Sequence, residues 1–192
     1  MTTQSTIKTE VQNFDLVVVG GGVAGCCAAI AAARQGCKVA LLQNRPVLGG
    51  NASSEVGLLI AGADRDFRHA RETGIMEEIN LENRFRNHEV LWSNYNMDIV
   101  LWTLVRNAGV NLFLNTNIDT VEMKGNKIRS VIGTQVGTEK RFHMSAKVFV
   151  DSSGDGILLS LSGGEFRRGT EAASEFGEPR APETASHITQ GS

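Results

Sequence analysis

Three glycines, Gly20, Gly22 and Gly25, fall on the G-x-G-x-x-G spacing that brings backbone amides close to paired phosphates. Gly20 permits a tight turn, Gly22 leaves room for a pyrophosphate where a Cβ would intrude, and Gly25 allows close packing of the following segment. The amides of Val23 and Ala24 would face the phosphates at a helix N-terminus, where the helix dipole favours negative charge. These residues predict a dinucleotide diphosphate site.

The segments around these glycines supply the elements that the site needs. Leu16 to Val19 is an apolar run typical of a strand buried on both faces of a parallel sheet. Val23 to Gln35 is rich in alanine and is followed by Gly36, so it predicts a helix that stops there. Cys37 to Leu42 predicts a second strand. Together they form a βαβ unit with a right-handed crossover.

The end of the second strand departs from the usual dinucleotide fingerprint. An Asp or Glu normally accepts hydrogen bonds from the adenosine ribose there, whereas this chain has Gln43, Asn44 and Arg45. The carbonyl oxygen of a glutamine can accept such a bond without the charge. The absence of the acid argues against NAD as the ligand more strongly than it argues against dinucleotides in general. Arg45 would be compatible with a ligand whose ribose is phosphorylated.

A second glycine pair follows, in the segment RPVLGGNASSEVG. With GGGVAG before it and RETGIMEEI and VDSSGDG after it, the chain resembles a bacterial family of FAD-dependent oxidoreductases. The resemblance is to the N-terminal part of proteins of the glutathione-reductase and fumarate-reductase type. It implies that Gly49, Gly50, Asn51 and Ser53 lie along the diphosphate and ribityl chain of FAD. The alternative is a plain loop, since Gly-Gly and Ser-Ser pairs are common in loops.

The segment VDSSGDG follows a third buried strand, predicted at Ala146 to Val150, and precedes a short helix from about Ile157. Asp155 could serve as the N-cap of that helix. The resemblance implies instead that Gly154 and Asp155 approach the cofactor, with Asp155 accepting a hydrogen bond from a ribityl hydroxyl. We expect the second role, because strand, glycine and acid occur together.

Between Ile118 and Met144 short alternating segments are separated by turn residues, which predicts a three-stranded antiparallel meander. A strand at Asn111 to Asn115 precedes it. The fold class expected is α/β, a Rossmann-like FAD-binding domain with a parallel sheet and a small β-meander. The resemblance implies that the backbone around Val121 touches the adenine ring. A nicotinamide-binding domain would instead continue with helices.

The helix expected over Leu91 to Ala108 is predicted to be largely buried. Its apolar face consists of Tyr95, Ile99, Trp102 and Val105, and is extended around the side by Leu101, Leu104 and Ala108. Another helix is expected from about Gly74 to Asn87, within an apparent insertion at about 56–94. Residues 1–13 are expected to be a polar tail, 14–163 the FAD-binding domain, and 164–192 the start of a following, incomplete region. The chain therefore looks like the N-terminal part of a longer, truncated flavoenzyme.

The composition excludes several classes of partner. The 192 residues contain 19 basic and 21 acidic side chains, so no nucleic-acid or membrane partner is expected. The N-terminal residues lack the apolar core of a secretory signal, which predicts a cytoplasmic protein. The 3 cysteines include no C-x-x-C pair, which argues against a disulfide framework or a dithiol reductase. No histidines at metal-ligand spacing are found, so no metal site is expected.

No residue is identified as catalytic from the sequence. Arg68, His69 and Arg71 are candidates for contact with an anionic substrate or for proton transfer, and a solvated loop with local ion pairs is the alternative. The function expected is FAD-dependent oxidation or reduction of a small molecule of unknown identity. An NAD(P)-dependent dehydrogenase domain and a truncated, non-catalytic dinucleotide-binding fragment remain alternatives.

Overall fold

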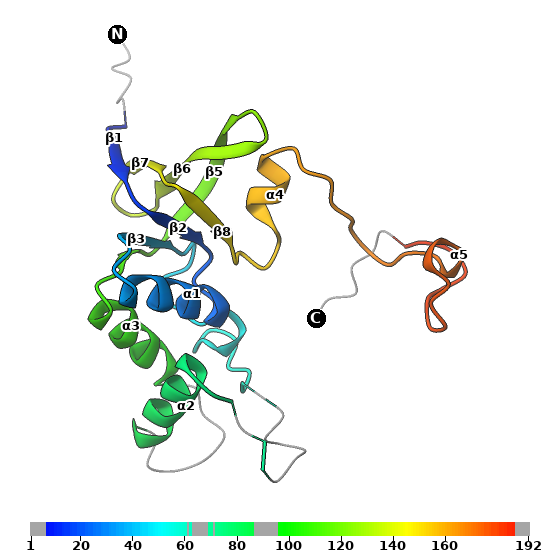
Figure 1. Cartoon of the computed structure of the whole chain (residues 1–192), viewed down its shortest axis with the longest axis horizontal. Coiled ribbons are helices and arrows are strands. Elements are labelled where there is room, and N and C mark those ends of the chain that lie inside the picture. Colours follow the sequence, from blue (N-terminus) through cyan, green and yellow to red (C-terminus); the bar gives the residue numbers. More distant parts are fainter. Residues whose placement is uncertain (1–6, 61, 63–68, 71, 87–95, 187–192) are drawn as a thin grey trace. The chain divides into compact units, whose positions relative to one another are not determined.

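The computed structural model describes residues 7–60, 62, 69–70, 72–86 and 96–186. The chain divides into two compact units, Met1–Ser162 and Gly163–Ser192. The first unit contains the two sheets and the glycine motifs (Figure 1). The second contains the short helix α5 (Ala173–Phe176) and an antiparallel bridge between Thr170 and Ser186. The site is built entirely from the first unit.

A four-stranded parallel sheet forms the centre of the first unit. Its strands are β2 (Leu16–Val19), β3 (Val39–Leu42), β4 (Asn111–Phe113) and β8 (Val148–Asp151), in the order β4-β3-β2-β8. Strand β2 lies between β3 and β8 and pairs in parallel with both. The carboxyl ends of these strands therefore meet at one edge of the sheet, which is where ligands bind in open α/β folds.

The apolar runs of the central strands β2 and β3 are buried on both faces, as the sequence predicts. Val18 and Leu41 belong to a core shared with the helices, while Val17, Val19 and Leu42 belong to a core shared with the second sheet. All five side chains are at most 5% exposed. Because successive side chains of a strand point to opposite faces, the parallel sheet packs on one face against the helices and on the other against the second sheet. The expectation of a buried strand is wrong for β8, where Val148 is 55% exposed, because β8 lies at an edge of the sheet.

The helical layer consists of α1 (Val23–Arg34), α2 (Ile75–Arg86) and α3 (Met97–Asn107), which lie together on one side of the parallel sheet (Figure 1). The predicted alanine-rich helix is α1. Gly36 follows it with φ of +86°, a conformation that ends helices and favours glycine.

The second sheet contains the predicted meander. Its strands β5 (Thr116–Lys124), β6 (Lys127–Gln135) and β7 (Lys140–Ser145) are antiparallel, and the order is β1-β7-β6-β5. The helices that a nicotinamide-binding domain would place between residues 118 and 144 are replaced by these strands. This finding agrees with an FAD-binding type of fold and not with the dehydrogenase alternative.

The expected polar tail at 1–13 differs from the structure at its end. Strand β1 (Thr9–Asn13) pairs in parallel with β7. Its side chains alternate between half-buried and exposed, and Val11 is 67% exposed, so no apolar run identifies it. Backbone pairing, together with the ion pair between Glu10 and Lys140, holds it on the meander.

The expected buried face of α3 is confirmed at Leu101 and Val105 and is wrong at Ile99 and Trp102. Ile99 and Trp102 are 45% and 44% exposed, whereas Val100 and Leu101 are fully buried beside Val105. Successive helical residues differ by about 100°, so a run as apolar as this one fits several faces. Contacts with α1 and α2 select the buried one.

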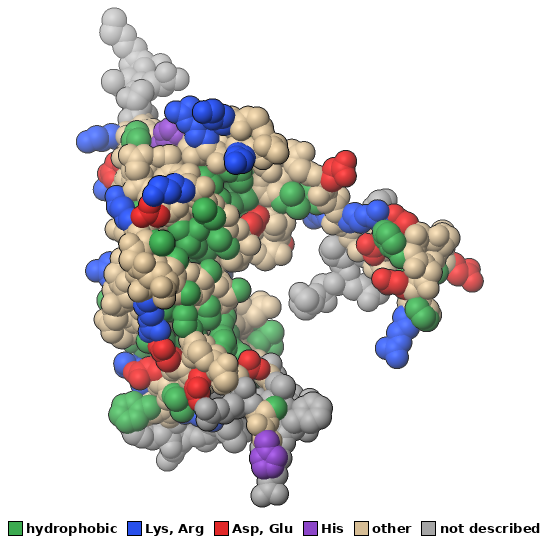
Figure 2. Space-filling model, in the orientation of Figure 1, with side chains coloured by type: hydrophobic (Ala, Val, Ile, Leu, Met, Phe, Trp, Pro, Cys, Tyr) green, Lys and Arg blue, Asp and Glu red, His purple; other side chains and the backbone are tan. Residues whose placement is uncertain are grey.

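The surface of the chain mixes charges of both signs. Figure 2 shows Lys and Arg side chains interspersed with Asp and Glu over the face in view. Within the described part of the chain, no helix combines the length and the apolar character needed to cross a bilayer.

Candidate functional site

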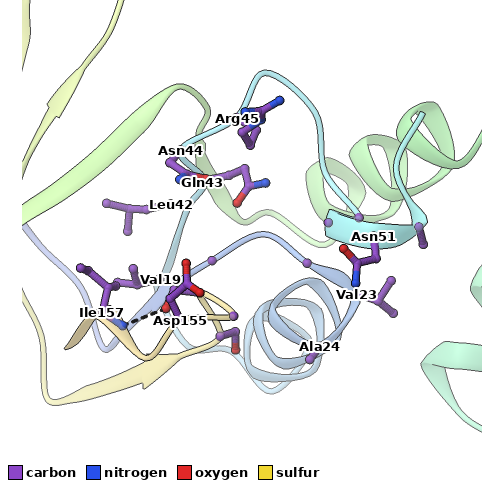
Figure 3. Close-up of a pocket in the computed structure, with 18 of the residues that line it drawn as sticks. Val19, Val23, Ala24, Leu42, Gln43, Asn44, Arg45, Asn51, Asp155 and Ile157 are labelled. Carbon is purple, nitrogen blue, oxygen red and sulfur yellow. Dashed lines mark hydrogen bonds between the residues drawn. The ribbon is translucent and has the colours of Figure 1, made fainter. Parts of the chain in front are cut away.

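A pocket of about 770 Å³ lies at the carboxyl ends of the parallel strands. Its walls come from the ends of β2 and β3, the first residues of α1, the second glycine pair, the start of β5 and the loop after β8 (Figure 3). Gly22, Gly49 and Asp155 all line it. The three corners that the sequence assigns to one ligand therefore lie on the same side of the sheet.

Two of the three motif glycines are required by close backbone contacts. Gly20 has φ of +104°, and a Cβ there would lie 2.2 Å from the carbonyl oxygen of Ser152. A Cβ on Gly25 would lie 1.9 Å from the carbonyl oxygen of Gly20. Gly25 does not line the pocket, and its role is to let α1 approach the turn.

Gly22 is different, because a Cβ at this position would meet no atom within 4 Å. It is the N-cap residue of α1, and no side chain caps the helix or places an acid in its first turn. The first amides of α1, including those of Val23 and Ala24, thus open onto the pocket with no acidic side chain in the first turn of the helix. This arrangement fits the diphosphate of FAD.

The second glycine pair is joined to the first glycine loop. The amide of Gly49 donates a hydrogen bond to the carbonyl oxygen of Gly21 at 2.8 Å, and Gly22 and Gly49 form an isolated parallel bridge. Gly50 begins the short 3₁₀ helix η1 (Gly50–Ala52), and Asn51 on this helix lies above the start of α1 (Figure 3). The two loops form one continuous surface beside the first amides of α1.

The three residues that follow β3, Gln43, Asn44 and Arg45, all line the pocket, but their side chains have different environments. The side chain of Gln43 is turned inward and is hydrogen bonded to backbone atoms of Gly21 and Val47. Arg45 forms an ion pair with Glu55 at 2.9 Å, so its charge is partly matched within the protein. Asn44 is exposed at the pocket wall.

The two aspartates of the VDSSGDG segment have separate roles. Asp151, which is not a pocket residue, accepts hydrogen bonds from the amides of Ser153, Leu158 and Leu159, and so caps the helix α4 (Ile157–Leu161). Asp155 points into the pocket beside Gly154, and its carboxylate has no hydrogen-bond or ion-pair partner among the described residues (Figure 3). The capping task is thus performed by Asp151, which leaves Asp155 available to a ligand.

The hydrogen bonds of Asp151 also determine its pKa. Partial burial alone would raise the pKa of this carboxyl group. The hydrogen bonds from Ser153, Leu158 and Leu159 together outweigh that effect and hold the pKa below its ordinary value of 3.8. Asp151 is therefore charged at neutral pH, as capping requires.

Besides Gly25, two residues assigned to the cofactor do not line the pocket. Ser53 is 1% exposed and lies behind the loop, and Val121 lies farther along β5, where it packs against the core between the sheets. The pocket is also lined by residues that the sequence does not identify. These are Thr116, Asn117 and Ile118 at the start of β5, and the run from Leu58 to Ile60. No motif distinguishes the first group, whereas the second is an apolar run within a polar segment.

The candidate catalytic residues gain no support from the described geometry. Arg68 and Arg71 lie outside the described residues. His69 is described, is exposed, and is not among the residues that line the pocket.

The cysteines occupy unlike environments. Cys26 is fully buried, and burial, followed by the neighbouring Cys27 thiol, raises the pKa of Cys26 to about 12. Burial also raises the pKa of Cys27, whereas Cys37 is exposed. Cys26 and Cys27 are free thiols, and Cys26 is held in the protonated form that makes a poor nucleophile.

Comparison with known proteins connects this geometry to a family. Residues 15–191 match the family model described as "FAD dependent oxidoreductase". A soluble pyridine nucleotide transhydrogenase of Ectopseudomonas mendocina is 54% identical over 43 residues, which are 22% of this chain and 9% of that protein. A fumarate reductase (cytochrome) of Shewanella frigidimarina is also 54% identical over 43 residues, 22% of this chain and 8% of that protein.

Solved structures share the fold. The flavin-dependent brominase Bmp2 superposes with a TM-score of 0.61 at 18% identity, over 83% of this chain and 43% of the brominase chain. The matched region therefore spans about a tenth of the length of the two relatives and less than half of the brominase.

Proposed function

The chain belongs to the FAD dependent oxidoreductase family, and from this premise we propose that it is the cofactor-binding part of an enzyme that oxidises or reduces a small molecule. The observation that carries the proposal is the open space in front of Gly22. Glycine is present there although no protein atom excludes a Cβ, at an uncapped helix N-terminus that faces the pocket. A ligand that approaches the backbone closely explains that choice of residue.

Each part of the pocket has a separate task in this proposal. The first amides of α1 bind the diphosphate, and the loop at Gly49 and Gly50 closes one side of it. The unpartnered carboxylate of Asp155 accepts a hydrogen bond from a ribityl hydroxyl. Gln43 and the start of β5 at Thr116 to Ile118 surround the adenosine end.

FAD supplies the redox chemistry when it is bound, by exchanging a hydride or electrons with a substrate. The residues of this chain bind and orient it. In this arrangement the helix terminus, which favours anions, takes the negatively charged diphosphate, and Asp155 takes an uncharged hydroxyl group. No residue of the chain is assigned in this proposal to catalysis, to substrate binding or to contact with an electron acceptor.

The test is retention of flavin by the purified 192-residue chain. The protein is incubated with excess FAD, passed through a desalting column and denatured, and the released flavin is identified by chromatography. We expect about one FAD per chain. Protein that binds NADH but remains colourless would favour a nicotinamide-dependent dehydrogenase, and protein that retains neither would overturn the proposal.

Turnover is tested separately, because a binding domain can retain flavin without catalysing a reaction. The FAD-loaded protein is mixed anaerobically with panels of small-molecule reductants, and bleaching of the flavin absorbance is followed. Bleaching by one chemical class supports an enzyme. Retention of FAD without bleaching by any class supports the non-catalytic fragment.

A further inference from the structure

Gln43 is a nearly buried amide that uses both ends of its side chain. It is 6% exposed, its Oε1 accepts a hydrogen bond from the amide of Gly21 at 2.8 Å, and its Nε2 donates one to the carbonyl oxygen of Val47 at 3.2 Å. Its backbone is also fixed, since its amide donates to Phe113 and its carbonyl accepts from Thr116. Gln43 therefore occupies one defined position between β3, β4 and β5.

The two atoms that the side chain contacts belong to the two glycine loops. Gly21 lies between Gly20 and Gly22, and Val47 precedes the second glycine pair by two residues. The carbonyl oxygen of Gly21 also accepts the hydrogen bond from the amide of Gly49. Gly21 is thus tied to the second loop directly through its oxygen, and through Gln43 by its nitrogen.

An ionised acid at position 43 could not make both contacts. A carboxylate could accept from Gly21, but it has no hydrogen to donate to Val47 and would place a charge against that carbonyl oxygen in a nearly buried site. The usual acid at this point of the fold serves the adenosine ribose. The amide in this chain satisfies both the buried amide of Gly21 and the partly buried carbonyl oxygen of Val47, whereas an ionised acid would satisfy only the first.

From this difference we infer that Gln43 is a positioning residue that cross-links the two glycine loops and holds the phosphate-binding amides at a fixed spacing before FAD binds. The identity of the ligand rests on the proposed function, whereas the cross-link is a property of the protein alone. The cross-link is neutral, so it does not depend on pH.

The cross-link is tested first without cofactor. Two variants are compared with the native chain: Gln43→Met, which removes both hydrogen bonds, and Gln43→Glu, which keeps the size but replaces the donor. Gln35→Glu is the matched control, because it makes the same chemical change at an exposed position after α1. Hydrogen exchange of the Gly21 amide and the thermal midpoint are measured from about pH 5 to pH 8.

For Gln43→Met we expect faster exchange at Gly21 and a midpoint lower by about 4 °C or more across this range. For Gln43→Glu burial and the facing carbonyl raise the pKa of the new carboxyl in the folded state. The protonated acid can donate to Val47, so stability is retained at low pH and lost as pH rises through the folded pKa. Gln35→Glu should show no pH-dependent loss of this kind.

FAD affinity provides the second measurement. At pH 8 Gln43→Glu should bind FAD at least about tenfold more weakly than the native chain. Unchanged exchange at Gly21 in both variants, with equal or tighter FAD binding by Gln43→Glu, would show that Gln43 serves only as a ribose contact and would overturn the inference. If the native chain binds no FAD, the proposed function fails, and the exchange and thermal measurements still decide the cross-link.

Discussion

The amide of Gly49 donates a hydrogen bond to the carbonyl oxygen of Gly21 at 2.8 Å, which joins two turns that are separated by the whole of α1 and β3. Because of this bond, the loop after β3 forms a wall of the pocket that begins at the helix N-terminus. The amides at the start of α1 and the second glycine pair are therefore parts of one structure.

Replacement of Gly22 should separate binding from folding. The Cβ of a valine at this position would meet no atom of the described residues within 4 Å, so we expect the free energy of unfolding to change by less than about 1 kcal/mol. The same side chain would occupy the space for the diphosphate, and FAD retention should be lost. Unchanged retention in Gly22→Val, measured after desalting, would contradict the assignment of the site.

Gly20→Ala is expected to give the opposite pattern. Its Cβ would lie 2.2 Å from the Ser152 carbonyl oxygen, and φ of +104° is unfavourable for alanine. We expect a loss of about 3 kcal/mol or more in the free energy of unfolding. Chemical denaturation of the two glycine variants side by side checks this contrast, and equal stabilities would refute it.

Asp155→Ala should affect the ligand more than the fold. The carboxylate has no partner among the described residues, so we expect a change in unfolding free energy within about 0.5 kcal/mol. Loss of a charge-assisted hydrogen bond should weaken FAD binding about tenfold. Titration of the variant with FAD, followed by flavin fluorescence, measures the effect, and native affinity would remove Asp155 from the site.

Asp151→Asn should destabilise the protein in a manner that depends on pH. Its folded pKa lies below 3.8, so its contribution is present above the unfolded value and is lost as pH falls through the folded pKa. We expect the variant to be less stable than the native chain by about 1–2 kcal/mol at pH 7, with the difference shrinking below about pH 4. Denaturation series at several pH values measure it. A difference that is constant with pH would contradict the capping role.

The cysteines should react in the order of their exposure. Cys37 is exposed, Cys27 is half-buried, and Cys26 is buried with a pKa of about 12. Because the thiolate is the reactive form, iodoacetamide should modify Cys37 first and Cys26 last in the folded chain. Peptide mass spectrometry after timed quenching gives the order. Fast, paired modification of Cys26 and Cys27 would contradict the packing of α1.

The sequence predicts the βαβ unit and the meander because their signals are local. Leu16 to Val19 is apolar throughout, alanines fill α1, and turn residues separate the strands of the meander. Strand β1 has no such signal, since its five residues, of which four are polar, become a strand only through pairing with β7. The buried face of α3 is likewise determined by its contacts with α1 and α2. The periodicity of the sequence carries no information about those contacts.

The same distinction applies to the pocket. Gly22, Gly49 and Asp155 are found from the sequence because each follows a strand at a characteristic turn. Thr116 enters the pocket because its amide bonds to the carbonyl of Gln43, a contact between strands that no motif encodes. The separate roles of Asp151 and Asp155 also require coordinates, since both acids occur in one short segment at the start of α4.

Backbone amide chemical shifts of the 192-residue chain during titration with FAD test the central claim most directly. The largest changes are expected at Val23 and Ala24, at Gly49 and Gly50, and near Asp155, with little change at Val121 on β5. Saturable shifts at these amides would locate the diphosphate at the start of α1. Saturation by FAD with shifts concentrated elsewhere, or the absence of shifts at Val23 and Ala24, would contradict the account.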